Sequence, residues 1–431
     1  MRTRLIALAT VIVVAGALLL LLGPLGGSQP NVLLICVDTL RHDHVGFGGC
    51  ERPVSPHIDA LAERGLVFPV AYSQSGWTLP SMATMLTGRY PSDTGATDFH
   101  RSLDRTLPTL ASILRAAGYD TRAFVSHMLL TPTYGFNKGF RKFDYSVLQV
   151  GHPHDVSTAD RLTHLAIADL DALEPPFFMW VHYFDPHFEY LPHDDWNSFG
   201  DEDIERYDQE IAYTDREIGR LLIALDQRGL LDDTIVIFTS DHGEEFGDHG
   251  GAFHYTSYEE VVRVPLAIAG PGIEPGTSDV RAQQIDFLPT VLSMVGVDGA
   301  PDDLPGVDLL SLEDDERAVF IERDRPPGFR QRTIIDGDLK LIAIAPADTN
   351  LIPWASRGTF SSFDNVRAGA FMYDLSYDPE ETDNVYIEGA PHTERMLAML
   401  NAFMEGRGAT SDAVEMDEAT REKLEALGYV Q

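Results

Sequence analysis

Five short runs of nearly uninterrupted apolar residues recur along this chain, and polar or turn-forming residues bound each of them. The runs are 31–37, 122–126, 177–183, 234–239 and 265–269. A strand whose side chains are apolar on both faces must be covered on both faces, which is typical of parallel sheets. The runs therefore predict a sheet with a layer of helices on each side.

Helical stretches lie between these runs, and a glycine follows most of them. Ser55 and Pro56 suit the N-cap and the first position of one helix, which ends near Gly65. The other stretches are 107–117, 204–228 and 283–295. Because strands alternate with helices, we predict an α/β fold with a mostly parallel central sheet flanked by helices.

The pattern changes near residue 312. Residues 332–345 alternate in polarity and contain Asp336-Gly337, a hairpin-turn signal. A short strand is predicted at 371–375, and helices at 394–406 and 420–427. We therefore divide the chain into an N-terminal segment (1–27), a main α/β domain (28–311) and a smaller C-terminal α+β subdomain (312–431).

The N-terminal segment has the pattern of a membrane anchor. Arg2 and Arg4 precede the uncharged apolar run 5–22, and glycines and a proline follow at 23–27. About 20 apolar residues span a bilayer, and flanking basic residues stay in the cytoplasm. We expect a membrane-anchored, extracytoplasmic protein, or a secreted one if the segment is a cleaved signal.

The balance of charge excludes one class of partner. The chain has 67 acidic and 32 basic residues, a net charge of −35. So acidic a protein repels nucleic-acid phosphates, and we expect no nucleic-acid partner. Its two cysteines, Cys36 and Cys50, are too few for a disulfide scaffold or a zinc cage of their own.

Polar side chains follow nearly every predicted strand of the sheet. They are Asp38, His127, the group His182, Asp185 and His187, and the pair Asp241-His242. Because the carboxyl ends of parallel strands meet at one edge of a sheet, these side chains should converge. Carboxylates with imidazoles suit one divalent ion, Mn²⁺ or Zn²⁺ in preference to Ca²⁺ or Mg²⁺. A second ion at Asp185, His187 and His254 is an alternative.

A second signal is Thr78-Leu79-Pro80-Ser81, at the start of a short helix that Gly88 ends. We place Pro80 at the first helical position and Thr78 just before the helix. Thr78 is then either a simple helix cap, or a nucleophile that attacks an anionic ester held at the helix N-terminus.

With these residues in view, the chain resembles the sulfatase family of the alkaline-phosphatase superfamily over nearly everything after the N-terminal segment. The blocks that carry the resemblance include NVLLICVDTLRHDHVG, WTLPSMATMLTGRYP, VHYFDPHFEY, TSDHGEEFGDHG and RVPLAIAGPG. The resemblance implies a large α/β domain with a smaller C-terminal sheet domain. Substrate specificity in the family lies in loops, here 189–203 and 351–365.

The resemblance also implies a metal site. Asp38, Asp241 and His242 match metal positions of the family. Thr39 stands where many members have a second Asp, and His242 where many have Asn. Both changes favour Mn²⁺ or Zn²⁺ over Ca²⁺.

Three histidines match positions near the substrate. His187 corresponds to a substrate-contacting histidine, and His127 to another. His254 lies near a position that is often Lys in the family. We therefore expect His187, or alternatively His127 or His254, to act in acid–base chemistry.

The chain departs from the family at the nucleophile. The pattern Cys/Ser-x-Pro-Ser-Arg is Thr78-Leu79-Pro80-Ser81-Met82 here. Sulfatases make formylglycine from that Cys or Ser, whereas phosphoester-cleaving relatives use a metal-bound Thr or Ser alkoxide. Three hypotheses follow: a phosphoester hydrolase or transferase that uses Thr78, also as a metal ligand; a sulfuric ester hydrolase by an unusual route; or a non-catalytic anion-binding protein. The substrate would be a small or polymer-borne anionic ester; no oligomeric state is predicted.

Overall fold

The computed structural model describes residues 29–149, 156–251, 253–312, 316–325, 329–346, 369–408 and 412–414. The predicted anchor, the loop 351–365 and the predicted helix 420–427 lie outside these residues. Within the described ranges, no helix is both long and apolar enough to cross a membrane.

The central sheet has eight strands, and its middle is parallel as predicted. In sheet order the strands are β5 (Lys142–Asp144), β4 (Asp120–Val125), β6 (Phe177–Tyr183), β1 (Asn31–Val37), β7 (Thr234–Ser240), β8 (Leu266–Ala269), β2 (Leu66–Val67) and β9 (Gly276–Thr277). Strands β5, β4, β6, β1 and β7 all run in parallel. Strand β8 is antiparallel to both β7 and β2, which the apolar pattern did not reveal.

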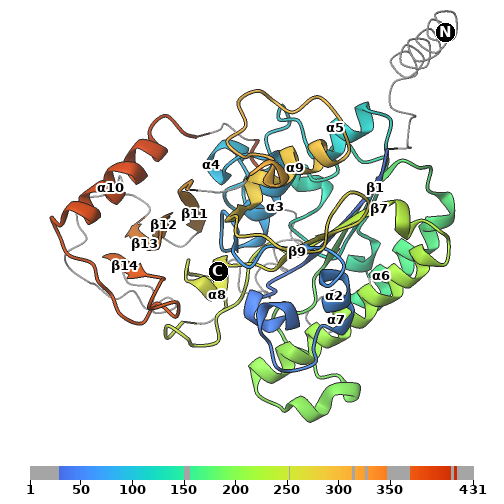
Figure 1. Cartoon of the computed structure of the whole chain (residues 1–431), viewed down its shortest axis with the longest axis horizontal. Coiled ribbons are helices and arrows are strands. Elements are labelled where there is room, and N and C mark those ends of the chain that lie inside the picture. Colours follow the sequence, from blue (N-terminus) through green and yellow to red (C-terminus); the bar gives the residue numbers. More distant parts are fainter. Residues whose placement is uncertain are drawn as a thin grey trace, which may run out of the picture.

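Helices cover both faces of this sheet, as Figure 1 shows. One layer contains α2 (Pro56–Ala62), α6 (Ala159–Asp169) and α7 (Asp203–Asp226), and the other contains α3 (Thr78–Thr87), α5 (Leu110–Ala116) and α9 (Phe287–Met294). Side chains of β1 alternate between the layers. Leu33 and Ile35 pack with α2, α6 and α7, whereas Leu34 and Cys36 pack with α3, α5 and α9. The parallel strands therefore lie within a core that is buried on both sides.

The shorter elements connect these layers. They are α4 (Pro91–Thr94), α8 (Glu259–Val262), the paired strands β3 (Ala71–Tyr72) and β10 (Ala282–Gln283), and 3-10 turns at His42–His44, Gly46–Gly48, Pro132–Tyr134, Ser146–Gln149, Leu170–Ala172, Asp194–Phe199, Leu231–Asp233, Gln284–Asp286 and Leu309–Ser311.

The C-terminal part is an antiparallel sheet with one helix packed on it (Figure 1). The strands β11 (Val319–Arg325), β12 (Phe329–Asp336), β13 (Leu339–Pro346) and β14 (Gly369–Asp374) pair in sequence order, and α10 (Pro391–Met404) follows. Gly337 joins β12 to β13 with a φ of 61°, as its predicted hairpin position requires. Met396 and Leu400 of α10 pack on Ile334 and Leu341. This confirms a smaller C-terminal α+β part.

Candidate active site

The carboxyl ends of four adjacent strands bring the predicted site residues together. Asp38 follows β1, His127 follows β4, and Asp241 and His242 follow β7, while His182 lies near the end of β6. All five side chains are fully buried. Because β4, β6, β1 and β7 are neighbours and parallel, their ends meet at one edge of the sheet, as the sequence predicts.

Four donor atoms in this group have the spacing of metal ligands. Nε2 of His242 lies 3.7 Å from Oδ1 of Asp38 and 3.6 Å from Oδ2 of Asp241. The Thr78 hydroxyl lies 3.3 Å from that nitrogen and 3.5 Å from Oδ1 of Asp38. Oxygen and nitrogen donors placed tetrahedrally at about 2.0–2.2 Å from Zn²⁺ are about 3.3–3.6 Å apart. The four atoms therefore fit one small divalent ion.

Backbone contacts orient these ligands. Nδ1 of His242 donates to the carbonyl of Gly243 at 2.9 Å, which leaves the lone pair of Nε2 for a metal. Oδ1 of Asp241 accepts from the backbone N–H groups of His242 at 2.9 Å and Thr39 at 3.3 Å. Thr39 reaches this contact with a φ of 54°, a left-handed conformation that is rare for threonine. Oδ2 of Asp241 has no hydrogen-bond partner among the described residues.

The electrostatics of the two carboxylates also favour a cation. Burial and the nearby Asp241 carboxylate raise the pKa of Asp38 well above its usual value. Burial alone would raise the pKa of Asp241, but the imidazoles of His242 and His182 lower it below its usual value. Two adjacent buried carboxylates repel each other, and a bound divalent cation would remove that cost. The donor set therefore fits the predicted metal in charge and in geometry.

Thr78 does not act as a helix cap. It is the first residue of α3 rather than the residue before it, and Pro80 is the third, so the predicted start was two residues late. The N-cap residue is Trp77, whose side chain makes no capping hydrogen bond. The buried hydroxyl of Thr78 lies within reach of Asp38 and His242, as described above. This arrangement excludes the cap hypothesis and places a hydroxyl at the predicted metal site.

Three histidines, His127, His187 and His254, lie around these four donor atoms. Nδ1 of His127 accepts from the backbone N–H of Leu129 at 3.1 Å, so the proton of a neutral His127 is on Nε2, 3.7 Å from Oδ2 of Asp38. The ring of His187 lies 6.2 Å from that of His127 and 5.4 Å from that of His254, between centroids. The ring centroid of His254 in turn lies 4.5 Å from that of His242. Imidazole side chains therefore lie next to the metal-ligand group.

The side chain of His254 contacts a buried carboxyl group that was not among the predicted site residues. Nδ1 of His254 lies 3.2 Å from Oε1 of the buried Glu244. Burial raises the pKa of Glu244 well above its usual value. A carboxyl group in this position fixes the orientation of the imidazole. The only sequence signal was its place two residues after His242.

The alternative of a second ion at Asp185, His187 and His254 does not fit the structure. The Asp185 carboxylate accepts from the backbone N–H of Thr158 at 3.0 and 3.1 Å and from its hydroxyl at 2.6 Å. Thr158 directly precedes α6. Asp185 therefore anchors the start of a helix, which is a common role for a buried aspartate.

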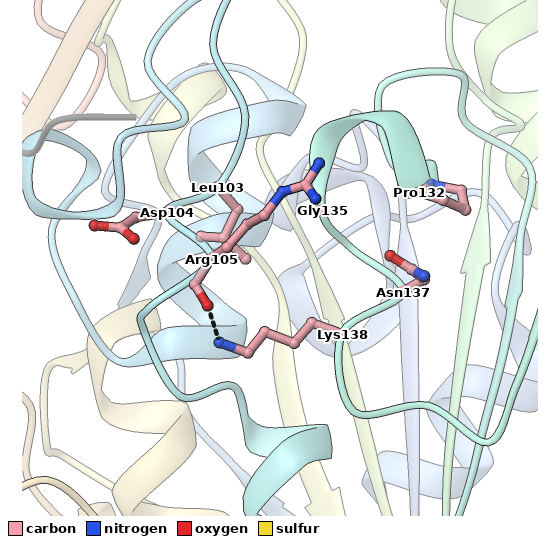
Figure 2. A pocket seen from close by; sticks show the side chains of 7 residues that line it. All are labelled: Leu103, Asp104, Arg105, Pro132, Gly135, Asn137 and Lys138. Carbon is pink, nitrogen blue, oxygen red and sulfur yellow. Dashed lines mark hydrogen bonds between the residues drawn. The ribbon is translucent and has the colours of Figure 1, made fainter. Parts of the chain in front are cut away.

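A separate cavity of about 310 Å³ opens elsewhere in the described structure (Figure 2). Its lining residues are Leu103, Asp104, Arg105, Pro132, Gly135, Asn137 and Lys138. The Lys138 ammonium donates to the carbonyl of Arg105. None of these residues belongs to the metal-ligand group, so the cavity is not the candidate active site.

The matching family model and the similar proteins of known name are all sulfatases. The family model described as Sulfatase matches residues 30–297, more than half of the chain. The choline-sulfatase of Rhizobium meliloti is 26% identical over 485 residues, which cover 92% of this chain and 89% of that protein. Human arylsulfatase A is 26% identical over 454 residues, with 86% of each chain covered.

Solved structures show the same fold. Ps i-CgsB in complex with k-i-k-neocarrahexaose superposes with a TM-score of 0.73 at 20% identity, covering 93% of this chain and 98% of that chain. The phosphonate monoester hydrolase of Agrobacterium radiobacter superposes with a TM-score of 0.69 at 22% identity, covering 87% and 96%. These likenesses confirm the fold, and the family match shows that this ester hydrolase belongs to the sulfatase family.

Proposed function

We propose that this protein cleaves or transfers a phosphoester with Thr78 as the nucleophile. The observation that carries the proposal is the position of the Thr78 hydroxyl, 3.3 Å from Nε2 of His242 and 3.5 Å from Oδ1 of Asp38. It completes a set of four donors with metal-ligand spacing. A hydroxyl in this position would serve both as a metal ligand and as the attacking group.

In this mechanism, Thr78 attacks phosphorus and the ester oxygen leaves. A divalent ion held by Asp38, Asp241, His242 and Thr78 would lower the pKa of the hydroxyl and neutralise charge on the phosphoryl oxygens. The hydroxyl proton leaves to solvent, the Thr78 oxygen forms a bond to phosphorus, and the bond to the leaving oxygen breaks. In the first turn of α3, Pro80 has no N–H and the N–H of Ser81 donates to the carbonyl of Trp77, so the N–H groups of Thr78 and Leu79 would stabilise the non-bridging oxygens.

A nearby histidine supplies the proton that the leaving oxygen needs. A neutral His127 presents its Nε2–H as a hydrogen-bond donor. His187, or His254 supported by Glu244, protonates the leaving oxygen. Water then releases phosphate from phospho-Thr78 in a hydrolase, or an alcohol accepts the phosphoryl group in a transferase.

The residues around Thr78 do not favour sulfatase chemistry by way of formylglycine. Thr78 carries a methyl group on Cβ in place of the Cys or Ser from which formylglycine is made. Met82, at the position of the family's arginine, is fully buried in an apolar cluster, with its sulfur 3.7 Å from that of Cys36. No cation therefore stands at that position. Sulfuric ester hydrolysis by another route is the competing proposal, because the relatives named above are sulfatases.

The two proposals predict opposite preferences on matched substrates. With aryl phosphate and aryl sulfate esters that share a leaving group, we expect kcat/KM for the phosphate to be larger by more than about tenfold, or about 1.4 kcal/mol in transition-state stabilisation. A sulfated Thr78 would lack the formylglycine route for release and would turn over poorly. Faster hydrolysis of the sulfate ester would instead establish the competing proposal.

A matched variant tests the same point. Thr78→Cys restores the residue type of a sulfatase but leaves Met82 in place. We expect no gain in sulfatase activity, because the maturation pattern stays incomplete. Intact mass spectrometry of this variant would also show whether the cysteine is converted to formylglycine.

A further inference from the structure

A layer of sulfur and imidazole side chains lies directly beneath the catalytic group. Cys36 of β1 and His182 of β6 are register partners on adjacent parallel strands. Met82 of α3 packs against Cys36 in the same cluster, one helical turn after Thr78. All three side chains are fully buried.

The donor atoms of this layer are close enough to share an ion. Sγ of Cys36 lies 3.7 Å from Sδ of Met82. The Cys36 sulfur, a nitrogen of His182 and a carboxylate oxygen of Asp241 all lie within 4.8 Å of one another. Two sulfur ligands at about 2.3 Å from a tetrahedral Zn²⁺ are about 3.8 Å apart. The sulfur pair already has this spacing.

His182 provides an independent reason to expect a ligand here. Neither of its ring nitrogens has a hydrogen-bond partner in the described part of the chain, and no atom of its side chain is exposed. Its Nε2 lies 3.9 Å from Oδ2 of Asp241, beyond hydrogen-bonding distance. A buried polar atom without a partner is unfavourable, and in native structures such atoms commonly mark an ion or a water.

We propose that Cys36, Met82, His182 and Asp241 form a second cation site, selective for a thiophilic ion such as Zn²⁺. On binding, the Cys36 thiol releases its proton to solvent and coordinates as the thiolate. Asp241 belongs to both sets, so this site adjoins the catalytic one. The two differ in chemistry, because thiolate and thioether ligands select soft ions, whereas the catalytic set contains only oxygen and imidazole donors.

The experiment uses Cd²⁺ as a spectroscopic substitute for Zn²⁺, because a Cd²⁺–thiolate bond absorbs in the ultraviolet. Full-length protein loaded with Mn²⁺ is titrated with Cd²⁺, and each point is read when the absorbance is constant. We expect the Cd²⁺–thiolate band to grow until one equivalent of Cd²⁺ per chain has been added. The chain has two cysteines, Cys36 and the half-buried Cys50, so Cys50→Ser is a matched control that should keep the band.

Further variants separate this site from the catalytic one. Cys36→Ser should lose the band, Met82→Leu should weaken Cd²⁺ binding, and Thr78→Ala should keep the band even where turnover is lost. Elemental analysis of Zn²⁺-loaded protein should give two ions per wild-type chain and one per Cys36→Ser chain. A wild-type protein without the band, or a band that disappears in Cys50→Ser, would overturn the proposal, whatever the outcome for phosphoester turnover.

Discussion

Replacing Thr78 with alanine is expected to reduce phosphoester turnover by roughly 10³-fold or more, because the substitution removes the nucleophile itself rather than one supporting contact. Asp38, Asp241 and His242 remain in this variant, and their mutual spacing is that of metal ligands. We therefore expect most of the bound metal to be retained. Steady-state kinetics and elemental analysis on the same preparation give both quantities.

The control for this prediction is Thr78→Ser, which keeps the hydroxyl and removes only the methyl group. It should retain far more activity than Thr78→Ala at a similar metal content. Near-normal turnover in Thr78→Ala would exclude the proposed mechanism and leave direct attack by water.

Asp241→Ala is expected to abolish metal binding and activity together. The carboxylate supplies a donor 3.6 Å from Nε2 of His242, and its other oxygen accepts backbone N–H bonds from Thr39 and His242. Its removal therefore takes away a ligand and a support for the ligand loop, and it leaves Asp38 as the one carboxylate of the catalytic set. The expected result is loss of the ion in elemental analysis and loss of turnover.

Asp185→Asn is the matched control, because Asp185 is also a buried aspartate after a strand of the same sheet. Its carboxylate bonds Thr158 and is not among the predicted ligands. This variant should unfold at a lower urea concentration and should keep its metal. Full metal occupancy in Asp241→Ala would refute the ligand assignment.

Much of this fold could be predicted from the sequence because parallel strands buried on both faces leave continuous apolar runs. The runs at 31–37, 177–183 and 234–239 correspond closely to β1, β6 and β7. Their polar ends then predicted the site, since parallel strands must place those ends at one edge of the sheet. The antiparallel direction of β8 left no signal, because a short buried strand is apolar whichever way it runs.

The details of the site depended on contacts that a linear pattern does not contain. Asp185 and Asp241 both follow buried strands, but only the fold shows that Asp185 bonds the residue before α6. His182 could be predicted from the sequence as one of the polar residues near the strand ends, but its two unbonded nitrogens are a tertiary property. The start of α3 at Thr78, two residues before the Pro80 position that helix rules favour, could likewise not be predicted from the sequence.

If Thr78 is the nucleophile, it carries a covalent phosphoryl group during turnover, and mass spectrometry detects that group on the peptide. The metal-loaded protein is mixed with a slowly released aryl phosphoester, quenched in acid during turnover and digested. We expect one added phosphoryl group on the peptide that contains Thr78, and no such addition in Thr78→Ala. Wild-type protein that turns the ester over with Thr78 unmodified, or with the phosphoryl group on another residue, would contradict this expectation.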